Sequence, residues 1–297
     1  MPGAPLTSPA GPVDVEGSRD RWRRVLLADP LALAGLAIIG TLVVAAILGP
    51  LIAPYPEQGQ GSTNVPERML PPSALHLLGT DQLGRDVLSR IIIGARPAFG
   101  VAILVVGLAI LIGVPLGAIA GYRRGRIDAV IMRATDLTLA FPPLLLAMAI
   151  VAALGPGLEH AALALAIAWW PWYTRLARAS AISLRERPFI EAARSIGLAD
   201  SRIIFGHIVP NSISPIIVQA TIDVGTVILA AGSLAFIGLG ARAPEADWGL
   251  MVAEGRTVIL DQWWIPTFPG LAIFVVVLGF NLVGDALRDL LDPRGGR

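Results

Sequence analysis

The sequence predicts an all-α, polytopic membrane protein with six transmembrane helices. Of its 297 residues, 55% are hydrophobic and only 15% are charged, and the mean hydropathy is +0.69. A soluble domain carries about 25% charged residues, so this composition argues against a water-soluble enzyme. The second observation is a series of six apolar stretches, because a helix needs about 20 mostly apolar residues to cross a bilayer.

The expected spans cover residues 31–53, 99–120, 137–154, 158–174, 215–239 and 264–282. The first, Leu31–Ala53, contains Thr41 as its only polar residue. The fourth is the weakest, because its uninterrupted apolar run, Ala161–Trp172, is short. We expect its helix to continue out of the bilayer through Tyr173 and Arg175.

The first span is not expected to be a cleaved signal peptide. Its apolar run exceeds the roughly 7–15 residues of a signal-peptide core, and it ends at Gly49-Pro50 instead of a small-residue cleavage site. Before it, residues 1–18 are rich in Pro, Gly, Ser and Ala without an apolar period, which indicates disorder. We therefore expect a tail over residues 1–28 and a six-span domain over residues 29–297.

The basic residues are distributed unevenly between the two sides of the expected membrane. All 23 are arginine, and 17 of them lie in the two terminal segments and the loops on one side. The other side holds the remaining 6. Because cytoplasmic loops carry the excess of basic residues, we expect both termini in the cytoplasm.

Several kinds of chemistry are missing from the sequence. Without cysteine there are no disulfides, thiolate metal sites or cysteine nucleophiles. Without lysine there is no Walker A loop, and no serine stands in a G-x-S-x-G nucleophile elbow. The three histidines, His76, His160 and His207, lie in three different segments. We therefore expect no enzyme activity, no catalytic residue, no metal and no cofactor in this chain, and a net charge of +1 gives no signal for nucleic acid.

The long outer segment, Tyr55–Arg96, is expected to contain an amphipathic surface helix that begins at Asp81. Two acid–base pairs at i,i+4 spacing support it, Asp81–Arg85 and Asp86–Arg90. Thr80 or Asp81 can cap its start. This helix either simply leads into the second span or forms a docking surface for an outer partner.

The inner segment, residues 175–210, is predicted to fold as two short helices that meet at Gly197. Pro188 suits the first turn of a helix, and Gly197 suits the left-handed position that ends it. Asp200 can cap a second helix that stops at Pro210. Glu191 has no second acid, nucleophile or metal ligand spaced to work with it, so the segment is expected to be a rigid knob that a partner pushes.

The run Glu191-Ala192-Ala193, followed by Gly197 and Pro210, resembles the EAA loop of ABC-importer permeases, E-A-A-x3-G-x9-I-x-L-P. The spacing agrees, but His207 and Val209 replace the Ile and Leu of the general pattern. The resulting H-I-x-P-N run is similar to the peptide/nickel branch of that family.

Three further stretches resemble the OppC/DppC-type subunit of the branch, and the resemblance covers roughly Trp22–Arg294. They are Gly79-Thr80-Asp81 with Gly84-Arg85-Asp86; L-A-F-I-G-L-G at 234–240 with Trp248-Gly249; and the segment 281–294.

This resemblance implies a type I ABC importer transmembrane domain in the cell membrane of a bacterium or archaeon. It implies a permease subunit that forms, as a heterodimer with a homologous permease, the path for dipeptides or oligopeptides. An external substrate-binding protein would deliver them, and two cytoplasmic ATPase subunits would bind ATP and Mg²⁺. The ATPase-coupling residues would be Glu191, Ala192, Ala193, Gly197, Asp200 and Pro210. The alternative within the branch is an importer of nickel or another small ligand.

Asp223 is the strongest anomaly within an expected span, because a carboxylate near the bilayer midplane costs about 2.5–3.5 kcal/mol. Together with Gln219, one turn earlier, it either lines the translocation path or is hydrogen-bonded to a neighbouring helix or the partner permease. A secondary transporter is less favoured, since it needs such groups placed symmetrically in two halves. Gly113, Gly117 and Gly121 are expected to serve close helix packing.

Overall fold

The computed structural model describes residues 29–291, and the regular structure in that range is helical, with one isolated bridge between Thr80 and Asp86. This confirms the prediction of an all-α protein. The predicted tail, residues 1–28, lies outside the described residues, as does the end of the chain from residue 292.

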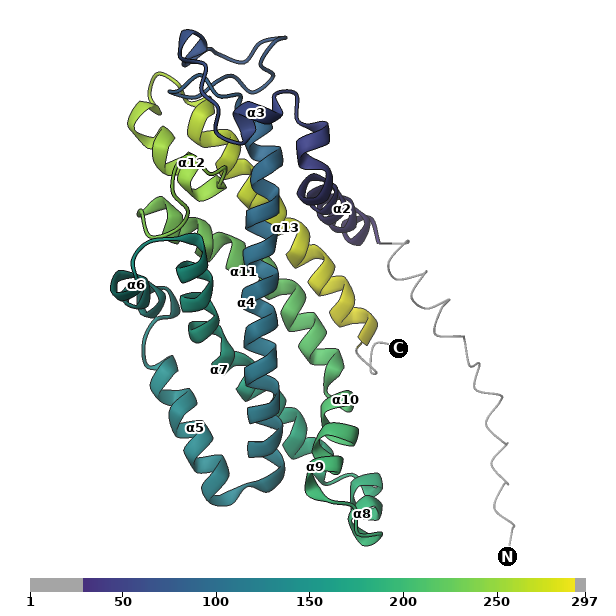
Figure 1. Ribbon diagram of the computed structural model, residues 1–297. Coiled ribbons are helices and arrows are strands. Elements are labelled where there is room, and N and C mark those ends of the chain that lie inside the picture. The colour runs from purple at the N-terminus through teal and green to yellow at the C-terminus, as the bar shows by residue number, and fades with distance from the viewer. Residues whose placement is uncertain (1–28, 292–297) are drawn as a thin grey trace, which may run out of the picture.

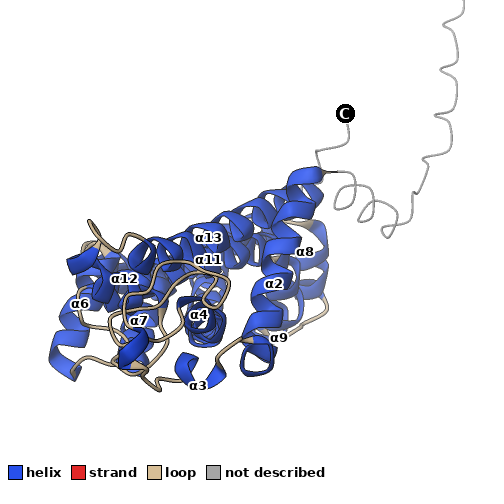
Figure 2. Ribbon diagram, turned by 90° about the horizontal axis from the view of Figure 1, so that it is seen from above, coloured by secondary structure: helices blue, strands red, loops and turns tan. Residues whose placement is uncertain are grey.

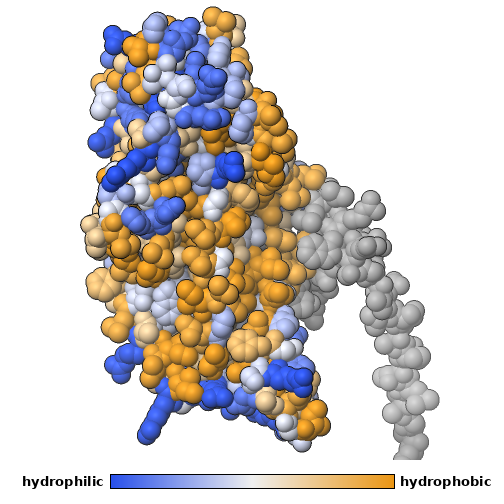
Figure 3. All heavy atoms as spheres, viewed as in Figure 1, coloured by the Kyte–Doolittle hydropathy of each residue, from blue (hydrophilic) through white to orange (hydrophobic). Residues whose placement is uncertain are grey.

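Five long helices dominate the molecule, with α4 running through its centre (Figure 1). They are α2 (Pro30–Ile52), α4 (Val87–Arg123), α7 (Leu158–Arg185), α11 (Ile213–Phe236) and α13 (Trp264–Leu291). Seen from above, α11 and α13 lie together on one side of α4 (Figure 2). In the space-filling view, hydrophobic residues occupy most of the middle of one face, and polar residues gather at both ends (Figure 3).

The structure supports four or five of the six predicted spans. Helices α2, α4, α11 and α13 are long and apolar enough to cross a membrane, and the pair α5 (Gly125–Leu139) and α6 (Pro143–Leu154) provides a fifth if it counts as one span. Helix α7, the predicted fourth span, does not meet the same criterion. It does continue through Tyr173 and Arg175, as predicted.

The third predicted span, residues 137–154, is not one straight helix. It breaks between α5 and α6, which are bent by 83° relative to each other. The cause is the pair Pro142-Pro143: each proline lacks the N–H for a helical hydrogen bond, and proline disfavours helical geometry in the residue before it. Pro143 instead occupies the first position of α6.

The prediction of a helix from Asp81 is wrong, because α4 begins at Val87. The Asp86 carboxylate caps α4 by accepting a hydrogen bond of 2.8 Å from the Ser89 backbone N–H. Gly84 has φ +75°, a left-handed conformation that cannot continue a helix, and a Cβ there would collide with the Asn64 carbonyl group. The segment before Val87 is therefore a tight turn.

The prediction that three glycines serve close helix packing is confirmed. Gly113, Gly117 and Gly121 of α4 all face α7, where an added Cβ would collide with the backbone carbonyls of Trp170, Thr174 and Arg178. These two helices therefore approach each other backbone to backbone along two turns.

Shorter elements gather at the two ends of the bundle (Figure 1). One end carries α3 (Pro56–Gly59), the 3₁₀ turn Val65–Glu67, α12 (Trp248–Gly255) and the 3₁₀ turn Arg256–Val258. The opposite end carries α8 (Pro188–Ser195), α9 (Asp200–Ile203), the π-helical turn Ile204–Ile208 and α10 (Val209–Asn211).

Candidate functional site

The predicted inner knob is a compact helical corner built from α8, α9 and the turn between them, which we call the coupling loop (residues 186–210). Pro188 occupies the first turn of α8, and Gly197 has φ +80° at its end. The amide of Gly197 donates to the Arg194 carbonyl at 2.9 Å, and the amide of Leu198 donates to the Ala193 carbonyl at 3.1 Å. This is the left-handed helix end that the sequence predicted.

The second half of the coupling loop differs from the prediction in two respects. Asp200 does not cap α9 through its side chain, because Ala199 is the N-cap residue and Asp200 lies in the first turn. Pro210 does not end the helix either. It lies within α10, which follows the π-helical turn and leads into α11 through Ser212. The backbone is helical on both sides of the junction, since Ile208 and Val209 both have right-handed helical geometry.

The coupling loop has an apolar inner face that anchors it to the ends of α4 and α7. Ile190, Ile203 and Ile208 are fully buried there. They form a cluster separate from the main core, and this second cluster also contains Ala118, Tyr122 and Ala181. Ala193 belongs to the same buried cluster, whereas Glu191, Ala192 and Gly197 are exposed. The loop therefore moves with α4 and α7 and not as a free appendage.

The exposed surface of the coupling loop carries large apolar side chains. Phe189, Ile196 and Phe205 all face solvent in this chain, and Ile196 is 78% exposed. Exposed apolar groups rimmed by polar residues are typical of protein interfaces. Glu191 and Ala192 lie on the same short helix as Phe189.

Tyr122, at the end of α4, connects the bundle to the coupling loop, and sequence reasoning missed it. Its hydroxyl donates to Asp200 Oδ1 at 3.2 Å and accepts from Arg194 Nε at 3.1 Å. The Arg194 guanidinium also lies 4.9 Å from the centre of the Tyr122 ring, within cation–π range. The Tyr122 carbonyl accepts from Arg185 at 2.8 Å. The only local signal was its place at the end of an apolar stretch, before Arg123-Arg124.

Asp223 lies inside the chain, between α11 and α7, and only 6% of it is exposed. Its Oδ1 accepts from Gln219 Nε2 at 3.0 Å, within α11. Tyr173 and Trp169 approach it from α7. Neither Asp223 Oδ2 nor the Tyr173 hydroxyl has a hydrogen-bond partner within residues 29–291. Gln219, by contrast, lines a cleft of about 390 Å³ that Arg288 also lines.

The outer end holds a buried ionic cluster that we call the outer latch: Asp81, Arg85, Arg90 and Glu254. The predicted Asp81–Arg85 pair forms at 2.6 Å, but the predicted partner of Arg90 is wrong. Arg90 pairs instead with Asp81 at 2.7 Å and with Glu254 of α12 at 3.0 Å. Both arginines are only 1% exposed. The cluster therefore joins the loop before α4 to a helix more than 160 positions later.

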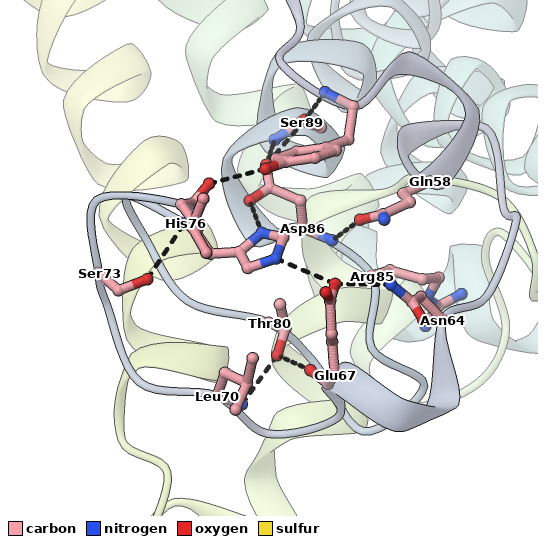
Figure 4. A network of polar contacts seen from close by, with 12 residues as sticks. Gln58, Asn64, Glu67, Leu70, Ser73, His76, Thr80, Arg85, Asp86 and Ser89 are labelled. Carbon is pink, nitrogen blue, oxygen red and sulfur yellow. Dashed lines mark hydrogen bonds and ion pairs between the residues drawn. The ribbon is translucent and has the colours of Figure 1, made fainter.

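Asp86, whose predicted partner Arg90 pairs elsewhere, takes part in a second polar network around His76 (Figure 4). His76 Nδ1 lies 2.9 Å from Asp86 Oδ1, and its Nε2 lies 3.3 Å from Glu67 Oε2. Gln58 Oε1 accepts from the Asp86 backbone N–H at 2.9 Å. These contacts order the loop of residues 55–86 over the end of the bundle. No group of three His, Cys, Asp or Glu side chains suited to a metal ion occurs in the part of the chain that the structure describes.

The outer end also contains Asp247, the N-cap residue of α12. Its Oδ1 accepts from the Leu250 amide at 2.9 Å. Burial raises the pKa of the Asp247 carboxyl above its ordinary value, against the opposing effect of the amide hydrogen bonds that it accepts.

Comparison with known proteins agrees with this architecture. Residues 113–296 match the family described as binding-protein-dependent transport system inner membrane component. Residues 18–72 match the N-terminal transmembrane domain of oligopeptide transport permease C. A chain of the MetNI methionine ABC transporter in an inward-facing conformation superposes with a TM-score of 0.56. It is 16% identical and covers 68% of this chain and 96% of its own, so it shows the shared type I importer fold alone.

Two relatives are much more similar in sequence. The probable D,D-dipeptide transport system permease protein DdpC of Escherichia coli K12 is 45% identical, over 94% of this chain and 92% of its own length. The dipeptide transport system permease protein DppC of Alkalihalophilus pseudofirmus is 48% identical, over 92% of this chain and 90% of its own length. The chain therefore belongs to the family of binding-protein-dependent transport system inner membrane components, as a permease of the OppC/DppC type.

Proposed function

We propose that this chain is the permease subunit of an ATP-driven importer of dipeptides or short oligopeptides. The observation that carries the proposal is the coupling loop. A short helix with exposed Phe189 and Glu191 projects from the ends of α4 and α7, to which Ile190 anchors it. The two relatives, a D,D-dipeptide permease and a dipeptide permease, indicate the substrate class.

The partners follow from this role. A homologous permease completes the path as a heterodimer, two cytoplasmic ATPase subunits bind ATP and Mg²⁺, and an external binding protein delivers the peptide. The chain itself is non-catalytic. On the arginine distribution, the coupling loop and both termini face the cytoplasm of a bacterial or archaeal cell.

The coupling role is assigned to residues of the exposed face. Glu191, Ala192 and Gly197 contact the ATPase subunit, and Ala193 holds α8 against the bundle. Asp200 acts from within the chain, through Tyr122 and through its ion pair of 3.3 Å with Arg123. Pro210 lies in α10, the helical segment that transmits the movement into α11.

Asp223 is assigned a structural role, because its side chain is buried and faces α7 and not an open cavity. Gln219 is the better candidate for the translocation path, since it lines a cleft.

The experiment is uptake of a radiolabelled dipeptide by cells that express the complete transporter. Glu191→Arg reverses the charge beside the exposed apolar side chains of α8, and Gly197→Asp puts a side chain in the left-handed position. Each variant should lower uptake at least about tenfold while the amount of inserted protein stays unchanged. A tenfold fall corresponds to about 1.4 kcal/mol of free energy lost from the contact with the ATPase subunit. Ser201→Ala, an exposed change in α9, is the matched control.

Unchanged uptake in either coupling variant would contradict the proposal. Equally contrary would be uptake by membrane vesicles that hold no ATP, which would instead indicate a secondary transporter.

A further inference from the structure

A cleft lined mainly by arginine lies beside the coupling loop. It has a volume of about 580 Å³ and lies between the end of α4, the start of α5, the end of α7 and the end of α8. Its lining consists of Tyr122, Arg123, Arg124, Arg126, Ile127, Arg185, Arg194 and Asp200. We call it the arginine cleft.

The positive charge of the arginine cleft is only partly neutralised within the chain. Arg123 pairs with Asp200 at 3.3 Å, and Arg124 pairs with Glu186 at 3.1 Å; all four side chains are well exposed, so these pairs are weak. Arg126 forms no ion pair or side-chain hydrogen bond with any residue from 29 to 291.

Arg185 and Arg194 have no carboxylate partner among the described residues. Both donate to Tyr122, one to its carbonyl and the other to its hydroxyl. Neutral acceptors leave their full charge in the cleft, so three of its five arginines have no ion-pair partner within residues 29–291.

The nearby acids of α5 form their ion pairs with arginines of α7 that lie outside the cleft lining. Asp128 binds Arg178 through two hydrogen bonds of 2.6 and 2.8 Å, and Asp136 binds Arg175 at 2.7 Å. Like charges in one cleft repel each other. An external anion with several acceptor oxygens, such as a phosphate group, would relieve this repulsion, since arginine donors match phosphate geometry.

An apolar stripe leads away from the cleft along α5. Ile127 lines the cleft and begins the stripe, which continues through Val130, Ala134 and Leu137. Steps of three and four residues place these side chains on one face of the helix. Val130 is 70% exposed and Leu137 is 64% exposed, so the stripe is uncovered in this chain.

We propose that the arginine cleft binds the phosphate headgroup of an anionic phospholipid, whose acyl chain lies along the α5 stripe. A cationic cleft that continues into an exposed apolar stripe matches the two halves of such a lipid. Basic pockets between membrane helices are known to take anionic headgroups. Because Tyr122, Arg194 and Asp200 belong to both the cleft and the coupling-loop contacts, the bound lipid stabilises the coupling loop against α4.

The test uses the complete complex that co-purifies with the chain, held in phosphatidylcholine nanodiscs with a minor fraction of phosphatidylglycerol. Native mass spectrometry then counts each lipid that the re-extracted complex retains. The variants are Arg126→Gln and the double variant Arg124→Gln/Arg126→Gln. Arg133→Gln, on the same helix but outside the cleft, is the matched control.

The wild type and Arg133→Gln should retain phosphatidylglycerol in preference to phosphatidylcholine. The ratio should fall about fivefold in the single variant and about thirtyfold in the double variant, the loss expected for one and two surface arginines. Phosphatidylcholine retention within each sample shows that the complex is intact. Val130→Asn, in the stripe, should weaken retention of phosphatidylglycerol without changing the arginines.

An unchanged lipid ratio in the double variant would overturn the proposal. So would displacement of phosphatidylglycerol by an excess of inorganic phosphate, because the cleft would then be a site for the free anion and the stripe would contribute nothing. Retention of the lipid in excess phosphate, with the graded loss above, supports it.

Discussion

At the scale of single residues, Tyr122 carries more contacts across the inner end than any local pattern suggested. Its hydroxyl lies between Asp200 and Arg194, and its ring lies under the Arg194 guanidinium. The side chain is almost fully buried although five arginines line the cleft beside it. Tyr122 therefore adds a polar connection between α4 and α8 to the apolar contacts of Ile190 and Ala193.

Tyr122→Phe should loosen the coupling loop without unfolding the protein. It removes two hydrogen bonds, each worth about 0.5–1.5 kcal/mol, and keeps the ring. Trypsin should then cleave faster after Arg194 and Arg202 in the purified complex, as read by mass spectrometry. Tyr55→Phe removes a comparable hydroxyl contact, to the Leu75 carbonyl at the opposite end, and should leave cleavage unchanged. Equal cleavage rates in both variants and the wild type would remove Tyr122 from this role.

Asp223→Asn tests the other buried polar residue. Asparagine keeps the acceptor for Gln219 and removes a charge that costs about 2.5–3.5 kcal/mol at this depth. The variant should therefore unfold at an equal or higher temperature and retain uptake of neutral and cationic peptides alike. Asp223→Leu should unfold at a lower temperature than Asp223→Asn, because only the leucine variant leaves Gln219 without its partner, at a cost of about 1–3 kcal/mol. Selective loss of cationic peptides in Asp223→Asn would instead place this carboxylate on the path.

At the scale of elements, the contact between α4 and α7 depends on the absence of side chains. Gly117→Ala would push a methyl group into the Thr174 carbonyl. We expect this overpacking to cost about 1–3 kcal/mol. Gly107→Ala, on the same helix, meets no atom within 4 Å and should be neutral or stabilising by up to about 1 kcal/mol. Thermal unfolding of the purified complex measures the difference between the two variants. Equal melting temperatures would show that α4 and α7 can move apart to accept the methyl group.

At the scale of the whole molecule, the outer latch and Tyr122 lie at opposite ends of one 37-residue helix, α4. The latch fixes its outer end to α12 through Glu254, and Tyr122 fixes its inner end to the coupling loop. One continuous helix therefore connects the contacts of the coupling loop with those of the outer latch.

Asp81→Asn should be strongly destabilising, since it leaves Arg85 and Arg90 with only Glu254 as a counter-charge in a buried site. Removing one partner from a buried ion pair costs about 3–5 kcal/mol. Asp136→Asn breaks the exposed pair with Arg175 and should cost less than about 1 kcal/mol. The measurement is thermal unfolding of the purified complex at neutral pH. Similar melting temperatures for the two variants would mean that the latch contributes little.

Sequence reasoning succeeded where the cause lies close along the chain. The left-handed Gly197, the glycine face of α4 and the Asp81–Arg85 pair all depend on neighbours within a few positions or on one helix period. It failed for the start of α4, because i,i+4 pairs favour a helix but do not reveal that Gly84 lies against the Asn64 carbonyl. It also missed Glu254, whose arginine partners lie in another segment.

The sequence alone determined that the chain is helical and membrane-embedded, and that a short helix ends at a left-handed Gly197, because apolar run length and turn chemistry are local properties. Tertiary structure decided which charges are buried, how α5 and α6 bend apart and which residues hold the coupling loop. Those outcomes depend on what each side chain meets across the bundle. The Asp86 carboxylate illustrates the difference: its spacing suggested Arg90, but packing placed His76 beside it and gave Arg90 to Asp81 and Glu254.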